Sequence, residues 1–449
     1  MEASKEVNDV YRQLGVRPVI NASGTLTRLG GSRMAPEVLE AMAAASRCYV
    51  RIEDLQEAAG RVIAEATGAE AGYVTSGAAA GLLLGTAACI AGLDLQKMER
   101  LPDTSVPGTK YEVIVHRAHR NSYDHAVRTA GARFVEIGRF GHPTPGPTRP
   151  YELECAINER TAMVLWVMMG DPEELGVLPL EETARIAHRH GVPVLVDAAA
   201  ALPPASNLRR FIAEGADLVC FSGGKALGGP QASGILAGRA ELIRSVALQH
   251  QDMDVHPETW TWRHLIAEGH LPGPPWQGIG RPCKVGREEI VGLLTALRLY
   301  LQRDHEAEIA RWRRLAQRMA DGLSGLPGVQ ATYHDGGARG VAGVRVQLDE
   351  AHLGKSAVQV VNELADGDPI IAVQQAGLDE GRFGLGTMCL ADGEEEIVIS
   401  RLREVLSSAL GSHSPPQAAV QPSSSPFGTC QAVGLDRSGV PPIRDSSQR

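Results

Sequence analysis

The sequence predicts an α/β protein with a large, doubly wound, mostly parallel sheet and a smaller C-terminal α+β domain. Two observations predict this fold class. From residue 72 to residue 237, short and nearly continuous apolar runs alternate with helical patterns, as expected for strands that helices cover on both faces. After residue 286 the pattern changes to two long amphipathic helices followed by short strands and helices, which is typical of a separate α+β unit.

The strands expected in the large sheet are 72–75, 111–116, 133–138, 161–169, 192–197, 218–221 and 234–237. The helical patterns between them cover 122–131, 151–159, 179–191 and 207–215. Before the first strand, Pro36 suits a first helical turn and Gly68 suits a helix end. The amphipathic helices over 287–304 and 305–325 then connect the sheet to the C-terminal unit.

These patterns divide the chain into four segments. Residues 1–35 form an N-terminal arm, residues 36–285 the large α/β domain, and residues 286–411 the connector helices with the small domain. The arm is rich in small and hydroxylic residues without helical period, so we expect an ordered loop that either serves the active site or packs on a partner subunit. Residues 412–449 are rich in Pro, Ser and Gln, so a disordered tail is expected.

Composition excludes several classes of protein. The chain has 449 residues and a net charge of −9 without a basic cluster, so nucleic-acid binding is disfavoured. The seven cysteines form no C-x-x-C pair and fit reduced thiols, and the charged N-terminus lacks the apolar core of a signal peptide. The uncharged stretch 71–93 is long enough to cross a bilayer, but it breaks at Ser76-Gly77. A cytoplasmic protein without a membrane span is therefore expected.

Lys225 is the first residue to suggest chemistry. It stands between two apolar strands in the stretch SGGKALGG, with glycines on both sides. Shielding from water disfavours the ammonium form, lowers the pKa of the amine and makes it a better nucleophile, as a Schiff-base lysine requires. A surface lysine in a hairpin loop is the alternative for this stretch.

Three further features lie at predicted strand ends, where ligands bind in open α/β sheets. Ser76-Gly77-Ala78 begins a helix of small residues whose free N–H groups suit a phosphate, or Ser76 is an ordinary helix cap. The stretch 116–124 contains histidines that suit a flat cofactor ring or a simple turn. Asp197 ends a buried strand, where a carboxylate needs a partner such as a protonated pyridine nitrogen, unless it caps the next turn.

The order of these features resembles pyridoxal-phosphate enzymes of fold type I. The stretches INASGTLTRLGGS, TGAEAGYVTSGAAAGLLL, HRNSYDHA, VDAAAALPP and SGGKALGGPQASGIL are similar to the family of bacterial selenocysteine synthase and D-glucosaminate-6-phosphate ammonia-lyase, which is class V aminotransferase-like. The resemblance covers roughly residues 10–410. It implies bound pyridoxal 5′-phosphate, a homodimer or higher oligomer, and active sites at subunit boundaries.

The resemblance also implies a role for individual residues. Lys225 matches the lysine that forms the Schiff base, Asp197 the carboxylate on the pyridine nitrogen, and His119 the residue stacked on the cofactor ring, with His116 and His125 as other choices. The positions implied for the cofactor phosphate are Ser76, Gly77, Ala78 and Ser222, with Arg281 and Lys284 reaching it from the next subunit. The candidates for binding the substrate are Arg382 in the small domain and Thr25, Arg28 and Arg33 in the arm.

The function implied is a lyase that acts on an amino acid or amino-sugar acid by Cα deprotonation, β-elimination and release of ammonia. A racemase or a C–C bond-forming enzyme is the alternative, because these reactions also begin at Cα. A non-catalytic regulator with the same fold would be expected to have lost Lys225. Selenocysteine synthase activity is not expected, since that enzyme carries an N-terminal RNA-binding region where this chain has a short arm.

Overall fold

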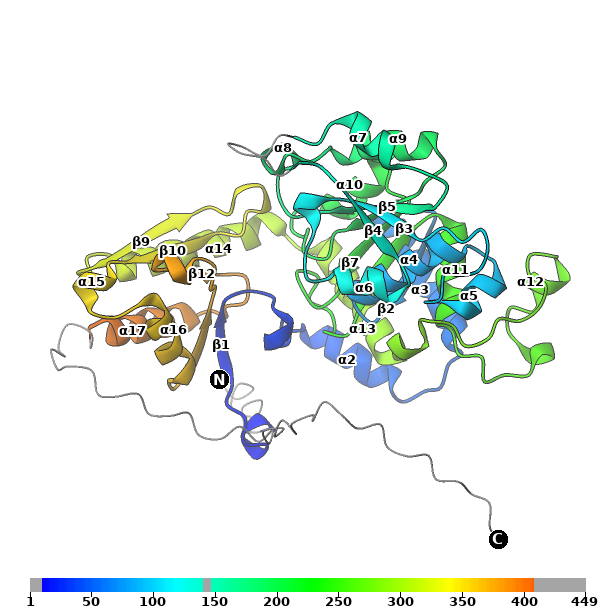
Figure 1. Ribbon diagram of the computed structural model, residues 1–449. Helices are drawn as coiled ribbons and strands as arrows, with labels where there is room; N and C mark the ends of the chain where they lie inside the picture. Colours follow the sequence, from blue (N-terminus) through cyan, green and yellow to red (C-terminus); the bar gives the residue numbers. More distant parts are fainter. Residues whose placement is uncertain (1–9, 140–146, 408–449) are drawn as a thin grey trace, which may run out of the picture. The chain divides into compact units, whose positions relative to one another are not determined.

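The computed structural model describes residues 10–139 and 147–407 (Figure 1). The described residues form one compact unit, and the tail expected over 412–449 lies outside them. Within the described ranges, no helix is both long and apolar enough to cross a membrane. The uncharged stretch near residue 80 is the strand β2 (Ala71–Thr75) and the helix α4 (Ala78–Ala91), interrupted at Ser76-Gly77 as expected.

In the described part of the chain, the large sheet has seven strands in the order β2-β8-β7-β6-β5-β3-β4. Its other strands are β3 (Glu112–His116), β4 (Arg133–Ile137), β5 (Thr161–Val167), β6 (Val194–Asp197), β7 (Leu218–Ser222) and β8 (Gly234–Gly238). The β3–β4, β3–β5, β5–β6 and β6–β7 pairs are parallel, whereas β8 runs antiparallel to both of its neighbours, β7 and β2. The expected mostly parallel sheet is confirmed.

Two apolar cores lie on opposite faces of this sheet. Along β6, Leu195 packs with Leu84 of α4 on one face, and Val196 packs with Ile63 and Phe211 on the other. The helices on the first face include α4, α5 (Leu95–Arg100), α6 (Asp124–Thr129) and α11 (Ala240–His250), and those on the second include α3 (Ile52–Thr67), α7 (Pro150–Ala156), α9 (Leu180–Arg189), α10 (Asn207–Ala213) and α13 (Arg287–Gln302). Helices on both faces explain the uninterrupted apolar strands.

The short helices complete this part of the chain. They are η1 (Thr27–Leu29), α2 (Pro36–Ala45), η2 (Arg117–His119), α8 (Pro172–Leu175), η3 (Pro257–Thr259), α12 (His264–Ala267) and η4 (Arg281–Cys283). Pro36 occupies the first turn of α2, and Gly68 ends α3 in the left-handed conformation, as the sequence predicts.

The C-terminal unit contains a three-stranded antiparallel sheet in the order β12-β10-β9. Its strands are β9 (Val329–His334), β10 (Gly343–Leu348) and β12 (Arg382–Gly386), and its helices are α14 (His305–Leu323), η5 (Gly337–Arg339), α15 (Glu350–Leu353), α16 (Ala357–Asp366), η6 (Leu378–Glu380) and α17 (Glu394–Ser407). Strand β1 (Val19–Ala22) of the N-terminal arm pairs in parallel with β11 (Ile370–Val373). The arm is therefore attached to the C-terminal unit by backbone hydrogen bonds, which its sequence pattern did not predict.

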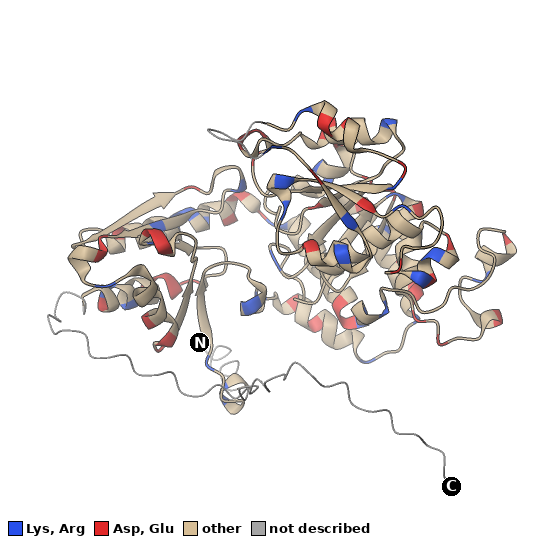
Figure 2. Ribbon diagram, in the orientation of Figure 1, with Lys and Arg blue, Asp and Glu red and all other residues tan. Residues whose placement is uncertain are grey.

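Charged residues of both signs are interspersed along the described helices and strands (Figure 2). Several of these charged residues form ion pairs with a residue three positions further along the chain. Examples are Arg51 with Asp54 and Arg401 with Glu404, each with a nitrogen–oxygen distance of 2.6 Å. Such exposed pairs contribute little to stability. The mixed distribution agrees with the absence of a basic cluster in the sequence.

Candidate active site

Seven of the residues predicted for the site, Lys225 and Asp197 among them, line one cavity of about 560 Å³. It lies at the end of the large sheet at which β2, β6 and β7 finish, and it is called the main cavity below. The predicted residues in its wall are Thr25, Ser76, Gly77, Ala78, Asp197, Ser222 and Lys225. Residues separated by up to 200 positions in the chain therefore meet at the strand ends, as expected for an open α/β sheet.

Lys225 follows β7 in the tight connection to β8. The connection is held by hydrogen bonds from Gly223 N–H to the Ser233 carbonyl and from Gly228 N–H to the Lys225 carbonyl, at 2.9 and 3.0 Å. A Cβ atom on Gly224 would lie 2.7 Å from the Gln231 Cα, so the glycines allow the two chain segments to approach. Lys225 is half-buried, and it therefore differs from the freely exposed hairpin lysine of the alternative interpretation.

Burial lowers the pKa of the Lys225 amine. The negative charge of Asp197 opposes this shift, whereas the guanidinium of Arg339 adds to it. No ion pair of Lys225 is present in the described part of the chain, so the amine remains available to react. The glycine-flanked sequence predicted this lowering of the Lys225 pKa by burial.

Asp197 lies at the carboxyl end of β6, between β5 and β7. Its Oδ1 accepts a hydrogen bond from the Ala199 N–H at 3.0 Å, and the Cys220 Sγ lies 3.9 Å from the same oxygen. Oδ1 therefore caps the turn, as the alternative interpretation expects, whereas Oδ2 has no hydrogen-bond donor among the described residues. Burial raises the pKa of this carboxyl, and the charge of Lys225 opposes the shift. A cationic partner facing Oδ2 would keep the carboxylate ionised.

The start of α4 provides an anion site in the wall of the main cavity. Gly77, with φ of 144°, precedes the helix and makes no side-chain cap, and the first intrahelical bond runs from the Gly81 N–H to the Gly77 carbonyl. The N–H groups of Ala78, Ala79 and Ala80 therefore lack intrahelical partners. The alternative that Ser76 caps the helix does not apply, so its hydroxyl is available to a ligand, as is the Ser222 hydroxyl.

Gly234 on β8 packs directly against this helix start, which suggests a first test. A Cβ at Gly234 would lie 2.6 Å from the Gly77 carbonyl carbon and 2.9 Å from the Ala78 nitrogen. Gly234→Ala should displace the anion site, with a loss of about 1–3 kcal/mol in the free energy of unfolding and a weaker affinity for cofactor. Thermal melts and cofactor titration measure the two effects. Gly273→Ala is the control, because no atom lies within 4 Å of the added Cβ.

His119, the residue expected to stack on the cofactor, is fully buried. Its Nδ1 accepts a hydrogen bond from the Val167 N–H at 3.2 Å, and its ring packs edge-on against Trp166 with centroids 5.2 Å apart. Burial and His116 lower the pKa of His119 to about 3, so the ring is neutral. The cavity wall near it is formed by Asn121, Ser122 and Tyr123. The stacking role of His119 stays a prediction that this burial does not favour.

The other two histidines considered for stacking lie elsewhere. His116 is also fully buried, with Nδ1 3.3 Å from Thr148 Oγ1. His125 is exposed on α6. Neither residue lines the main cavity within the described part of the chain.

The structure places the remaining predicted binding residues away from the main cavity. Arg382 is paired with Glu380 at 2.9 Å on β12, and Arg28 is exposed on η1. Lys284 and Arg281 line a separate pocket of about 370 Å³, where Arg281 pairs with Asp252 at 3.0 Å. Arg33 is paired with Glu394 at 2.6 Å. The roles given to these residues therefore remain predictions.

Sequence reasoning missed several residues of the site. Arg339 lies in the turn η5 between β9 and β10, its Nη2 donates to the Leu202 carbonyl at 2.8 Å, and its charge acts on Lys225. Thr27 and Gln231 also line the main cavity. The signal for Arg339 is its position in DGGARG, an arginine among glycines, but its distance from Lys225 in the sequence concealed its relevance.

The chain is similar to one protein-family model and to two known enzymes. A family model described as SelA, L-seryl-tRNA selenium transferase, matches residues 114–253. The chain is 34% identical over 402 residues to D-glucosaminate-6-phosphate ammonia lyase of Salmonella typhimurium (strain 14028s / SGSC 2262), covering 88% of this chain and 98% of that protein. It is 35% identical over 405 residues to 5′-C-glycyluridine monooxygenase-decarboxylase of Streptomyces sp, covering 88% of this chain and 92% of that protein.

The chain is also similar to solved structures of known enzymes. A structure of D-glucosaminate-6-phosphate ammonia-lyase has a TM-score of 0.72 at 33% identity, covering 89% of this chain and 98% of that one. The Escherichia coli cysteine desulfurase CsdA, at 18% identity, a TM-score of 0.51 and coverage of 84% and 92%, shares the fold. The protein is thus a pyridoxal-phosphate enzyme of fold type I. It belongs to the family of D-glucosaminate-6-phosphate ammonia lyase, as the sequence indicated.

The residues of the main cavity fit pyridoxal phosphate. The free N–H groups at the start of α4, with the hydroxyls of Ser76 and Ser222, suit a phosphate. Asp197 is a buried residue whose Oδ2 has no donor among the described residues and can face a protonated ring nitrogen, and Lys225 offers an amine of lowered pKa to the aldehyde. These complementary groups share one wall, so the cofactor assignment agrees with the geometry.

Proposed function

We propose that the enzyme is a lyase that removes a β-substituent and ammonia from an amino acid or amino-sugar acid. The observation that carries this proposal is that Lys225 and Asp197 share one cavity with the free N-terminus of α4. The similarity to an ammonia lyase over 98% of that relative's length supports the choice of reaction. Where the β-substituent is a hydroxyl, the net change is loss of ammonia, because the water lost in β-elimination is consumed again when the carbon–nitrogen bond is hydrolysed; for another substituent, that group leaves with its proton and one water is consumed.

The bound cofactor would supply an electron sink for negative charge at the substrate Cα. The chain's own residues do the rest. Asp197 holds a proton on the ring nitrogen, because an adjacent carboxylate favours the cationic form. Lys225, whose pKa is lowered, accepts the Cα proton as a neutral amine. Ser76, Ser222 and the start of α4 hold the phosphate and fix the position of the ring.

Arg339 is the residue that we assign to the substrate carboxylate. Its hydrogen bond to the Leu202 carbonyl anchors it, and its charge reaches Lys225. By contrast, Arg382 is paired with Glu380. Arg28 and Arg339 are both exposed and neither is among the described residues that line the main cavity, so the effect of the Arg339 charge on Lys225 is the observation that favours Arg339. A guanidinium binds a carboxylate through two parallel hydrogen bonds, which would orient the substrate Cα beside Lys225.

Arg339→Gln should therefore raise KM about tenfold or more, since a charged hydrogen bond contributes about 1.5–3 kcal/mol. It should also shift the pH titration of the enzyme's visible spectrum upward, because loss of a nearby cation raises the pKa of the Lys225 nitrogen. Steady-state kinetics and a spectral pH titration measure these effects. Arg345→Gln, an exposed arginine on β10, is the control. An unchanged KM would contradict the assignment.

We also propose that the enzyme works as a homodimer or higher oligomer in the cytoplasm. The pocket with Arg281 and Lys284 is bordered by Val50 and Ile52, and the neighbouring Tyr49 is 95% exposed. Exposed apolar residues beside a pocket that also holds charged residues of both signs suit a subunit boundary. This arrangement supports the expectation that Lys284 serves the cofactor phosphate of the next subunit.

The decisive experiment is a screen of amino acids and amino-sugar acids for keto-acid and ammonia release. Exchange of the Cα proton in deuterated water is followed in parallel. Ammonia release with exchange supports the lyase, whereas exchange with inversion and no ammonia indicates a racemase. The 35% identity to a monooxygenase-decarboxylase gives a second candidate, oxidative decarboxylation, which consumption of O2 and release of CO2 would reveal.

A further inference from the structure

A second cavity, with a volume of about 350 Å³, adjoins the main cavity at Lys225. Lys225 and Thr25 line both cavities. The other walls of the second cavity come from the arm, from the end of α13 and the start of α14, and from the segment after β12. A side chain in these walls can therefore face the substrate Cβ while Lys225 faces the neighbouring Cα.

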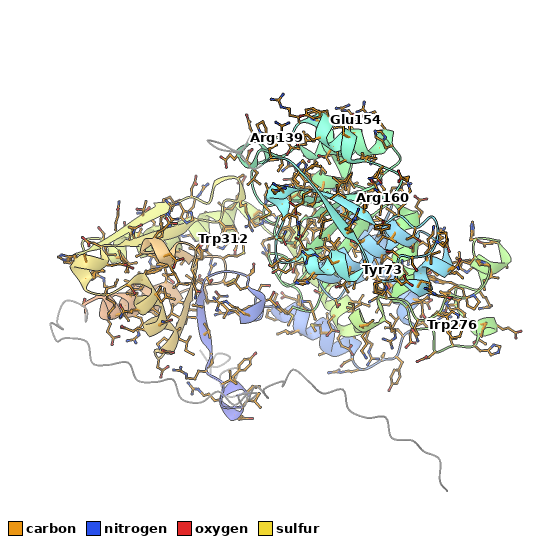
Figure 3. All side chains as sticks on the ribbon, viewed as in Figure 1. Tyr73, Arg139, Glu154, Arg160, Trp276 and Trp312 are labelled. Atoms are coloured by element: carbon orange, nitrogen blue, oxygen red, sulfur yellow. The ribbon has the colours of Figure 1, made fainter. Side chains whose placement is uncertain are left out.

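Tyr300, near the end of α13, lines the second cavity and carries a buried hydroxyl group. The residue is 1% exposed, and its Oη has no hydrogen-bond partner among the described residues. His305 Nε2 and Trp312 Nε1 are unpaired polar atoms of the same lining, and Trp312 lies on α14 (Figure 3). Buried polar groups in folded proteins nearly always have partners, because leaving them unpaired is costly. The Tyr300 hydroxyl is therefore available to a polar group that enters during the reaction.

Two guanidinium groups act on the Tyr300 hydroxyl. Burial raises the pKa of Tyr300 to about 12, so the hydroxyl is protonated at neutral pH, and the charges of Arg303 and Arg339 oppose this shift. The Arg303 guanidinium lies 5.4 Å from the centre of the Tyr300 ring. The charge of Arg339 also acts on Lys225. Tyr300 can thus give up a proton and leave a phenolate that the two cations stabilise.

We propose that Tyr300 is a catalytic residue that donates its hydroxyl proton to the leaving β-substituent of the substrate. This inference rests on the proposed lyase reaction and adds the acid that this reaction uses. A β-hydroxyl leaves poorly as hydroxide, because the pKa of its conjugate acid, water, is about 15.7. A positioned acid removes this difficulty, since the departing oxygen is protonated as its bond to carbon breaks.

The elimination step balances with these two residues. Lys225 accepts the Cα proton, and the electron pair of the Cα–H bond ends in a double bond between Cα and Cβ. The Cβ–O bond breaks with its electron pair on the oxygen, and the Tyr300 proton converts the departing hydroxide into water. The phenolate of Tyr300 then regains a proton from the solvent. No oxidant or reductant takes part.

Tyr300→Phe tests the assignment, because it removes the hydroxyl oxygen and keeps the aromatic ring. With a β-hydroxy substrate found by the ammonia-release screen, we expect ammonia release to fall about 100-fold or more, while exchange of the Cα proton stays within about twofold. The affinity for cofactor, the visible spectrum and the melting temperature should stay unchanged. Tyr333→Phe, on β9, is the matched control, because Tyr333 is not among the described residues that line either cavity.

A second substrate distinguishes the loss of an acid from the loss of correct geometry. In the analogue that carries chlorine in place of the β-hydroxyl, the leaving group departs as chloride and needs no proton. Tyr300→Phe should therefore release ammonia from the chloro analogue at about the wild-type rate. Rescue by the better leaving group is not expected for a residue whose role is only structural.

Two results would overturn the role of Tyr300 and leave the lyase reaction in place. Unchanged ammonia release from the β-hydroxy substrate would show that protonated Lys225 or solvent supplies the proton. Equal losses of Cα exchange and of ammonia release, without rescue by the chloro analogue, would show that Tyr300 orients the substrate. A wild-type enzyme that releases no ammonia from any compound in the screen would instead refute the proposed reaction, and the role of Tyr300 with it.

Discussion

Replacing Lys225 with alanine is expected to abolish both covalent attachment of the cofactor and turnover. Among the described residues that line the main cavity, Lys225 is the one lysine, and burial lowers the pKa of its amine. An uncharged amine at neutral pH is the form that reacts with an aldehyde. The variant removes this amine and also the base for the Cα proton, so the two functions should disappear together.

Borohydride reduction followed by peptide mapping measures the attachment directly. In the wild-type enzyme the label should be found on the peptide that contains Lys225, and in the variant no lysine should be labelled. Lys110→Ala is the matched control, because Lys110 is exposed just before β3. A label on another lysine in the wild-type enzyme would show that the assignment of Lys225 is wrong.

Asp197→Asn is expected to slow exchange of the substrate Cα proton about tenfold to a hundredfold. The carboxylate favours a proton on the cofactor nitrogen, and this ion-paired hydrogen bond is worth about 1.5–3 kcal/mol. Asparagine keeps a side-chain oxygen for the Ala199 N–H, so the local turn should survive. Phosphate contacts at the start of α4 should also hold the cofactor.

The measurement is Cα–H exchange in deuterated water at saturating cofactor. Asp349→Asn is the control for a purely capping aspartate, since Asp349 Oδ1 accepts from the His352 N–H at 3.0 Å at the start of α15. Both variants should melt at similar temperatures. If Asp197→Asn exchanged the proton at the wild-type rate, Asp197 would have only the turn-capping role, and the electron-sink assignment would fail.

Much of the fold was predictable because its signals are local. The strand that ends at Asp197 and the helix that begins at Ala78 each follow from a short run of apolar or small residues. Long-range pairing was not predictable in the same way. The antiparallel insertion of β8 between β2 and β7 depends on which edges meet, and so does the attachment of β1 to β11. No single segment encodes such a choice, because hydrogen bonds between strands have no sequence specificity of their own.

Within the candidate site, the proposed reactive groups were predictable from local sequence. Lys225, Asp197 and the Ser76-Gly77 helix start were recognisable because each needs particular neighbours: glycines, a buried strand or small side chains. Which other residues accompany them depends on the tertiary structure. It buried His119, let the charge of Arg339 in the C-terminal unit act on Lys225, and grouped the unpaired polar atoms of Tyr300, His305 and Trp312 around a second cavity that Lys225 also lines. The physical reason is that burial and electrostatic interaction depend on distance in space, and the packing of segments far apart in the chain sets that distance.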